Sequence, residues 1–254
     1  MSPAPSLTAP ESEHVPRPRA GCLRLFSANL WNGRADPEAL AAIVGALAPD
    51  VVAVQELDRA QAAALSAVMP HGTLEPASDY TGMGIALRHP GSVRRICLPV
   101  RDARATEVAV PGSNGNGQSI EVINIHVQAP HVFPVPSTFL RRRGQLRGLQ
   151  RHLDATPRRR RVVVGDFNAT PGWPVYERIA ARLTDAAVSF ARRHGRPPER
   201  TWGPWPSAPR LLRIDHAFVS GLAVEYFRLV LVPGSDHRAI LIDVAVEEEE
   251  VLAS

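Results

Sequence analysis

The stretch that decides the fold is residues 161–171, which read Arg-Val-Val-Val-Gly-Asp-Phe-Asn-Ala-Thr-Pro. Its three consecutive valines predict a buried β-strand, which ends at a glycine followed by Asp166 and Asn168. Asp and Asn directly after a strand are common turn residues, so the stretch alone leaves two interpretations open. Either the two side chains only form a turn, or Asp166 orients or deprotonates a water while Asn168 donates hydrogen bonds to charge that develops on a substrate.

The same pattern, a polar side chain where an apolar run stops, recurs along the chain. Asn29, Glu56 and His126 each stand at the end of a β-like apolar run. Side chains at the ends of adjacent strands meet at one rim of a sheet, which is where α/β folds usually build their sites. We therefore expect these three side chains and Asp166 to lie together.

Glu56 and Asp236 are candidate ligands for a hard divalent cation. Mg²⁺ takes oxygen ligands from one or two carboxylates and keeps several waters, so these two acids suffice. Asn29 is a further candidate in the metal shell. The competing interpretations are that Glu56 is a strand-end charge that reaches solvent and that Asn29 only caps a turn.

The triplet Ser235-Asp236-His237 lies in a loop before the last predicted strand. A second acid, Asp215, stands inside an otherwise apolar strand, where a buried carboxylate needs a partner such as a protonated imidazole. If Asp215 orients His237, then His237 becomes an acid/base or phosphate-binding group. His126 is a candidate phosphate contact, although isolated Asp-His pairs and strand-end histidines are commonly structural.

Short β-like runs alternate with fewer helical segments. Strands are predicted at 23–30, 51–54, 84–87, 93–97, 107–110, 120–126, 161–164, 213–219, 224–232 and 239–246, and helices at 37–47, 61–69, 138–154 and 174–183. Several strands follow one another without a helix, which favours an α/β fold with mixed sheets over a purely parallel one. Residues 111–119 are predicted to form a hairpin loop.

Composition fits one globular domain. The chain has 254 residues, 44% hydrophobic and 21% charged, with a net charge of +4. Lysine is absent, so all 29 basic residues are arginines. We expect a flexible leader at 1–20, a folded domain at 21–247 and an acidic tail at 248–254. Two cysteines exclude a disulfide framework, and neither a signal sequence nor a transmembrane segment is evident, so we expect a cytoplasmic protein, most simply a monomer.

Six motifs, taken in order, resemble those of the endonuclease/exonuclease/phosphatase superfamily, whose members include deoxyribonucleases, abasic-site endonucleases, neutral sphingomyelinases and inositol phosphatases. The motifs are Ser27-Ala28-Asn29-Leu30, Val54-Gln55-Glu56, Asn124-Ile125-His126, Gly165-Asp166-Phe167-Asn168, Ile214-Asp215-His216 and Ser235-Asp236-His237. Six motifs in this order are far more specific than any one, and other segments resemble the small bacterial branch of the superfamily. The segment 79–104 departs from the better-known nucleases, since it offers no assignable aromatic or acidic partner for the phosphate-binding histidine.

The resemblance implies a four-layer α/β/β/α sandwich of two mixed sheets flanked by helices, with Mg²⁺ or Mn²⁺ at the rim. It implies that Glu56 is the principal metal ligand and that Asn29 and Asp236 lie near the metal. It further assigns water orientation and phosphate stabilisation to Asp166 and Asn168, phosphate binding to His126, and catalysis to His237 paired with Asp215. The expected step is in-line attack of water on phosphorus.

Three functions follow from this reading. The leading one is a metal-dependent phosphodiesterase or phosphatase that acts on a small or lipid-derived phosphate ester. The second takes DNA or RNA as substrate, motivated by the arginines at 141–143 and 158–161. The third is an inactive binding module. Trp202 and Trp205 could rim a pocket or stack on a base, but the favoured interpretation is that they are loop aromatics that cover the core.

Overall fold

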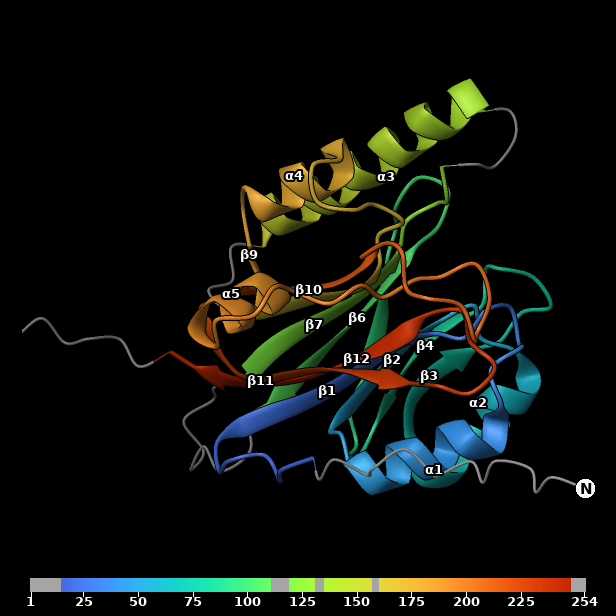
Figure 1. The fold of residues 1–254 in the computed structure, drawn as a ribbon, viewed down its shortest axis with the longest axis vertical. Coiled ribbons are helices and arrows are strands. Elements are labelled where there is room, and N and C mark those ends of the chain that lie inside the picture. The colour runs from blue at the N-terminus through green and yellow to red at the C-terminus, as the bar shows by residue number, and fades with distance from the viewer. Residues whose placement is uncertain (1–14, 111–118, 131–134, 157–159, 248–254) are drawn as a thin grey trace, which may run out of the picture.

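Two six-stranded β-sheets lie face to face, with helices on the outer surfaces (Figure 1). The computed structural model describes residues 15–110, 119–130, 135–156 and 160–247. Its layers confirm the predicted α/β/β/α sandwich of two mixed sheets.

The two sheets are built on the same plan. In strand order, the first contains β11 (Leu222–Leu231), β12 (Arg238–Val246), β1 (Cys22–Asn29), β2 (Val51–Gln55), β4 (Met83–Leu87) and β3 (His71–Glu75). The second contains β5 (Val93–Ile96), β6 (Ala103–Ala109), β7 (Ser119–His126), β8 (Arg161–Asp166), β10 (Asp215–Ser220) and β9 (Thr184–Asp185). Each sheet has one central parallel pair, β1 with β2 and β7 with β8, and the other pairs are antiparallel.

Each parallel pair is joined by a helix that crosses over its sheet, as parallel strands require. Helix α1 (Pro37–Leu47) joins β1 to β2, and its N-terminus is capped by Asp36, which accepts from two backbone N–H groups. Helix α3 (Val135–Ala155) joins β7 to β8. The remaining helices are α2 (Arg59–Val68), α4 (Pro174–Ala180) and α5 (Ala186–Arg193). In the described part of the chain, no helix combines the length and the apolar character that a membrane crossing needs.

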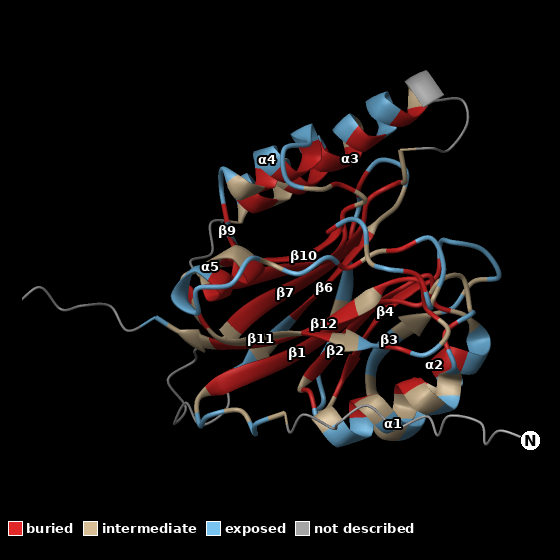
Figure 2. Ribbon diagram, in the orientation of Figure 1, coloured by how far each residue is buried: buried red, intermediate tan, exposed pale blue. Residues whose placement is uncertain are grey.

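Apolar side chains form three cores, and Figure 2 shows the buried strands between the half-exposed helices. One core fills the space between the sheets, from residues such as Leu25, Ile85, Val122 and Ile242. Another packs the second sheet against α3 and α4, and the third packs the first sheet against α1 and α2. Strands covered on both faces explain why their sequences are continuous apolar runs.

One buried polar link joins the two sheets below the site. The side-chain Nδ2 of Asn124, on β7, donates to the backbone oxygens of Val54 and Gly84 in the other sheet, each at 2.9 Å. Gln55 Nε2 in turn donates to Asn124 Oδ1 at 2.6 Å. Asn124 and Gln55 are fully buried, so water cannot replace these bonds. The link sets how the strand ends of one sheet face those of the other.

The structure contains every predicted strand and helix, with shifted ends and three additions. Strand β6 begins at Ala103 rather than at 107, β10 begins at Asp215 rather than at 213, and α4 ends at Ala180 rather than at 183. The sequence reading missed β3, β9 and α5. The predicted hairpin loop lies outside the described residues except for Ser119.

The predicted leader and tail fall largely outside the described residues, which exclude 1–14 and 248–254. The described end of the leader contacts the domain. Val15 packs against the core under α1 and α2, and the backbone oxygen of Pro16 accepts from Arg24 at 2.6 Å. Residues 15–20 therefore follow the surface of the first sheet.

Asn124→Leu tests the link between the sheets, because leucine is similar in volume but donates no hydrogen bond. A buried acceptor left without a partner costs about 1–3 kcal/mol, so we expect the free energy of unfolding to fall by about 2–4 kcal/mol. Urea denaturation followed by circular dichroism measures the change. Gln150→Leu on the half-exposed side of α3 is the control, with an expected change below about 0.5 kcal/mol. A loss below about 1 kcal/mol for Asn124→Leu would contradict the proposed contribution.

Candidate active site

The ends of the two parallel pairs bring four predicted residues together. Asn29 ends β1, and Glu56 directly follows β2, its parallel neighbour. His126 and Asp166 end β7 and β8 and stand opposite each other in the register of that pair. Because both pairs end at the same side of the sandwich, the first sheet supplies two side chains and the second supplies the other two (Figure 1).

Asn29 bridges the two carboxylates. Its Nδ2 donates to Glu56 Oε1 at 3.1 Å and to Asp166 Oδ2 at 3.0 Å. Its Oδ1 accepts from the backbone N–H of Trp31 at 2.9 Å, which fixes the orientation of the amide. Asn29 and the two carboxylates that it bridges are buried. Its hydrogen bonds therefore hold two acids from different sheets at a defined separation.

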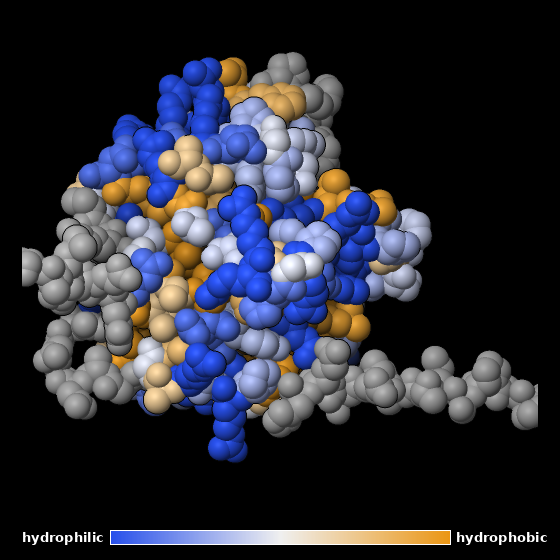
Figure 3. All heavy atoms as spheres, turned by 60° about the vertical axis from the view of Figure 1, so that its left-hand side comes forward, coloured by the Kyte–Doolittle hydropathy of each residue, from blue (hydrophilic) through white to orange (hydrophobic). Residues whose placement is uncertain are grey.

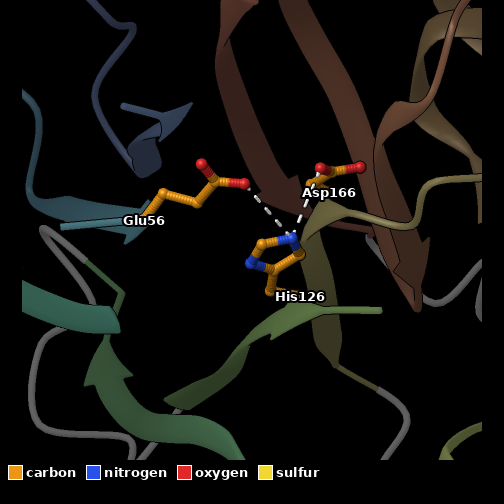
Figure 4. A group of neighbouring side chains, drawn as sticks. All are labelled: Glu56, His126 and Asp166. Carbon is orange, nitrogen blue, oxygen red and sulfur yellow. Dashed lines mark ion pairs between the residues drawn. The ribbon is translucent and has the colours of Figure 1, made fainter. Parts of the chain in front are cut away.

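The imidazole of His126 faces the same two carboxylates (Figure 4). Its Nε2 lies 3.7 Å from Glu56 Oε1 and 3.6 Å from Asp166 Oδ2. Burial, together with the charges of Arg101 and His237, lowers the pKa of His126 well below its usual value. The ring is therefore neutral at physiological pH and has one nitrogen available as a ligand or acceptor.

The residues present fit a divalent cation. Glu56, His126 and Asp166 offer ligand atoms that all lie within 4.8 Å of one another, as do Asp166, Asp215 and His237. Glu56 Oε2 and Asp236 Oδ1 are buried, and neither has a hydrogen-bond partner among the described residues. Buried oxygens of this kind are what a hard cation binds. Asp236, a predicted ligand, lies outside both tight groups.

Burial raises the pKa of three acids at the site. Burial raises the pKa of Glu56 and of Asp236. Burial, with the neighbouring charge of Asp215, raises the pKa of Asp166 to about 7. Bringing negative groups together out of water disfavours their charged forms, and a bound cation would offset this cost.

Asp215 and His237 form the predicted pair. His237 Nδ1 lies 2.8 Å from Asp215 Oδ2, and Nε2 lies 3.8 Å from Asp236 Oδ1. Burial alone would lower the pKa of His237, but the charges of Asp215, Asp166 and Asp236 outweigh burial and raise it to about 10. His237 is therefore an imidazolium at neutral pH.

Ser235 places His237 against the first strand. Its hydroxyl donates to the backbone oxygen of Asn29 at 2.8 Å and accepts from the backbone N–H of His237 at 3.0 Å. The loop before β12 is thereby attached to the end of β1. Trp202 holds the intervening acid, because its Nε1 donates to Asp236 Oδ2 at 3.0 Å.

Asn168 lies beside Asp166 but turns its amide inward. Its backbone N–H donates to Asp166 Oδ1 at 2.7 Å, and its Nδ2 donates to Asp166 Oδ2 and to the backbone oxygen of Val127, both at 3.0 Å. Arg142 supports this turn through the backbone oxygen of Asn168 at 2.9 Å. Asn168 therefore orients Asp166 directly in this arrangement.

Strained backbone gathers at the site. Among the described residues, six that are not glycine have a positive φ, and five of them lie in loops at this end of the sandwich: Trp31, Asn32, Glu56, Val100 and Asn168. Gly165 shows why its position needs glycine, since a Cβ there would lie 2.0 Å from the backbone oxygen of Ile125. Such conformations persist only where the surrounding structure enforces them, as it does at functional sites.

Arg101 is the site residue that the sequence reading missed. It lies in the loop between β5 and β6, and its NH1 is buried with no hydrogen-bond partner among the described residues. Burial lowers the pKa of Arg101, while the charges of Glu56, Asp166 and Asp79 oppose that effect. The segment that offered no aromatic or acidic partner for His126 thus supplies a cation, and no sequence pattern distinguishes Arg101 from the other arginines.

For the loop tryptophans, the structure favours the pocket-rim interpretation of Trp202 and does not support Trp205 as a core cover. Trp202 hydrogen-bonds Asp236, as described above, and so takes part in the site. Trp205 is 56% exposed and covers no core. A tryptophan in a proline-rich loop carries no periodicity from which its contacts follow.

Comparison with known proteins gives the family from the sequence and the fold from solved structures. The sequence matches the model of the Endonuclease/Exonuclease/phosphatase family over residues 26–237. Curated proteins gave no match to this sequence. Solved structures share the fold, with an endonuclease/exonuclease/phosphatase from Beutenbergia cavernae at 22% identity and a TM-score of 0.65, covering 89% of this chain and 72% of that one.

Two further structures show the same likeness. Humanized D. rerio TDP2 has 20% identity and a TM-score of 0.68 over 89% of this chain and all of that one. The human Nocturnin catalytic domain has 21% identity and a TM-score of 0.62 over 91% and 96% of the respective chains. With the family match across most of its length, the chain belongs to the endonuclease/exonuclease/phosphatase family.

Proposed function

We propose that the protein is a divalent-metal-dependent hydrolase of phosphate esters. The observation that carries the proposal is the buried group of Glu56, His126 and Asp166, which has an unpartnered carboxylate oxygen and lies beside the imidazolium of His237. Glu56 and Asp236 would hold Mg²⁺ or Mn²⁺, and Asn29 would position Glu56 beside the ion through its amide. The ion would supply Lewis-acid stabilisation of charge on the phosphate oxygens.

The proposed chemistry at the chain's own residues is in-line attack of water on phosphorus. Asp166 accepts a proton from the attacking water, and its pKa of about 7 suits a general base at neutral pH. Asn29 and Asn168 hold both oxygens of Asp166 in place for that step. As the new P–O bond forms, the ester P–O bond breaks, and the leaving oxygen takes a proton from solvent and departs as the alcohol.

Cations and neutral donors at the site would stabilise the phosphate. His237 stays protonated because Asp215 holds its Nδ1, so Nε2 can donate to a phosphate oxygen. Arg101 NH1, which has no hydrogen-bond partner among the described residues, can donate to a second oxygen, and His126 contributes an imidazole. Fixed charges of this kind are the main means of catalysing phosphoryl transfer.

Nucleic acid is the second candidate substrate. Exposed arginines on α3, such as Arg141 and Arg143, favour it, since phosphate contacts by cations drive nucleic-acid binding. Another structure of D. rerio TDP2 is complexed with a single-strand DNA product, at 15% identity to this chain. An oligonucleotide in the substrate panel separates this candidate from small esters.

Hydrolysis of bis(p-nitrophenyl) phosphate with Mg²⁺ or Mn²⁺ tests the reaction, alongside p-nitrophenyl phosphate and an oligonucleotide. We expect EDTA to abolish activity and Asp166→Asn to lower kcat by about 10²–10⁴-fold, because the general base is lost. Glu56→Gln should weaken Mn²⁺ binding by about tenfold or more in calorimetric titration. Asp154→Asn, an exposed acid on α3, is the matched control. Protein that binds Mn²⁺ yet hydrolyses no ester contradicts the proposal.

Asp215→Asn tests the pairing with His237. Burial lowers the pKa of His237 while the charge of Asp215 raises it, so removing that charge should bring the pKa well below about 10. NMR titration of the imidazole, with EDTA present, measures the shift. The rate should also begin to fall at a lower pH than in wild type, since His237 loses its proton earlier. An unchanged pKa would show that Asp215 does not control the proton.

Arg101→Gln tests the missed cation. Charge-assisted hydrogen bonds contribute about 1.5–3 kcal/mol, so we expect kcat/KM to fall roughly 10–100-fold. Arg147→Gln, an exposed arginine on the outer face of α3, is the matched control and should leave kcat/KM unchanged. Equal kinetics for both variants would remove Arg101 from the phosphate-binding group.

A further inference from the structure

Exposed apolar side chains gather at one end of the sandwich. Nine large apolar residues are exposed in the described part of the chain, and the topology places all nine around the candidate active site. Tyr80 stands in the loop before Met83, which pairs with Gln55. Val100 precedes β6, Trp173 follows the end of β8, and Leu231 ends β11 opposite Arg238.

The other five lie in two segments at the same end. Trp205, Leu211 and Leu212 belong to the loop before β10, which bridges to His237 through Trp202. Phe139 and Leu140 lie near the start of α3, 57% and 68% exposed. We call these nine residues the apolar rim. Among the described residues, no large apolar side chain is exposed at the opposite end of the sandwich. The exposed apolar residues are therefore confined to the end that carries the candidate active site.

Phe139 and Leu140 are the two most exposed residues of the apolar rim. Gln145 donates to the backbone oxygen of His126 at 2.9 Å, which fixes this part of α3 at the end of β7. The two residues lie on the helix turns before that anchor, whereas Leu146, Leu149 and Leu153 turn into the core. Figure 1 shows this end of α3 standing clear of the body, and Figure 3 shows hydrophobic surface there beside hydrophilic surface.

The outer face of α3 carries unpaired positive charge. Arg141, Arg143, Arg147 and Arg151 are exposed and have no ion pair in the described part of the chain. The one acid in the helix, Asp154, lies near its C-terminal end and pairs with Arg182 at 3.5 Å. Exposed apolar side chains next to these arginines match the surface of an anionic membrane, in which negatively charged headgroups cover a hydrocarbon interior.

We propose that the apolar rim docks onto the surface of an anionic lipid bilayer, so that the site acts on a phosphate ester presented at that surface. The choice of substrate rests on the proposed function, whereas the docking does not. A lipid surface fits better than nucleic acid because Val100, Leu140 and Leu231 have no π-face on which a base could stack. Hydrocarbon accepts all nine side chains.

The arginines of α3 lie at different distances from its exposed apolar end, so the distant arginines serve as a control for the effect of charge on binding. With a rise of about 1.5 Å per residue, Arg143 lies about 5 Å behind Leu140 and Arg151 about 17 Å behind it. The Debye length at physiological salt is about 8 Å, so arginines near the tip should contribute and the distant ones should not.

Sedimentation of the full chain with vesicles tests the docking, using phosphatidylcholine alone and phosphatidylcholine mixed with phosphatidylglycerol. We expect binding to the mixed vesicles, and the double variant Phe139→Ser/Leu140→Ser should weaken it by about tenfold or more. Arg141→Ser/Arg143→Ser should weaken binding about tenfold on mixed vesicles only. The charge-matched Arg147→Ser/Arg151→Ser should change it by less than about threefold. Hydrolysis of a soluble diester should be unaffected by the Phe139→Ser/Leu140→Ser change.

The outcomes separate the two proposals. Wild-type protein that hydrolyses the soluble diester but does not sediment with mixed vesicles overturns the docking and leaves the hydrolase. Protein that sediments as expected but hydrolyses nothing supports the docking and rejects the hydrolase. If an oligonucleotide competes with vesicles and Phe139→Ser/Leu140→Ser leaves both ligands bound as before, the surface serves nucleic acid and the lipid proposal is wrong.

Discussion

The buried hydrogen bonds of Asn124 are the constraint on which the site depends. Apolar packing between the sheets is non-directional and would tolerate small shifts of one sheet over the other. Asn124 removes that freedom because its amide reaches two specific carbonyls of the facing sheet. The bonds lie two residues below His126, and Glu56 and Asp166 approach from opposite sheets directly above them. The spacing between those carboxylates therefore depends on the buried amide of Asn124.

The acids and the histidine at the site then determine one another's protonation states. Burial raises the pKa of Glu56, Asp166 and Asp236, so an isolated cluster of these acids would tend to bind protons. His237 responds in the opposite sense, because the charges of Asp215, Asp166 and Asp236 raise its pKa and keep it protonated. The arrangement places a base with a pKa of about 7 beside a protonated imidazole within one site, which is how groups with different roles coexist at a single pH.

How much the sequence revealed depended on whether a residue was tied to a regular element. Asn29, Glu56, His126 and Asp166 could be predicted to meet because each stands at the end of an apolar strand, and the structure brings them together. Strand β3 escaped notice because its half-exposed sequence has no alternation, and β9 has only two residues. Arg101 and Trp202 could not be predicted, since loop residues find their partners only through the three-dimensional path of the chain.

The pairing of β1 with β12 has a consequence for the order of assembly. Cys22 stands opposite Ala245, so β1 has one of its two neighbours, β12, more than 200 residues away in the sequence. Ser235, which attaches to Asn29, and His237 also belong to the late segment. During translation, the acids contributed by the first two-thirds of the chain have no imidazolium beside them until that segment emerges. The imidazolium therefore joins the site late, and until then Arg101 is the cation that faces Glu56 and Asp166 among the described residues.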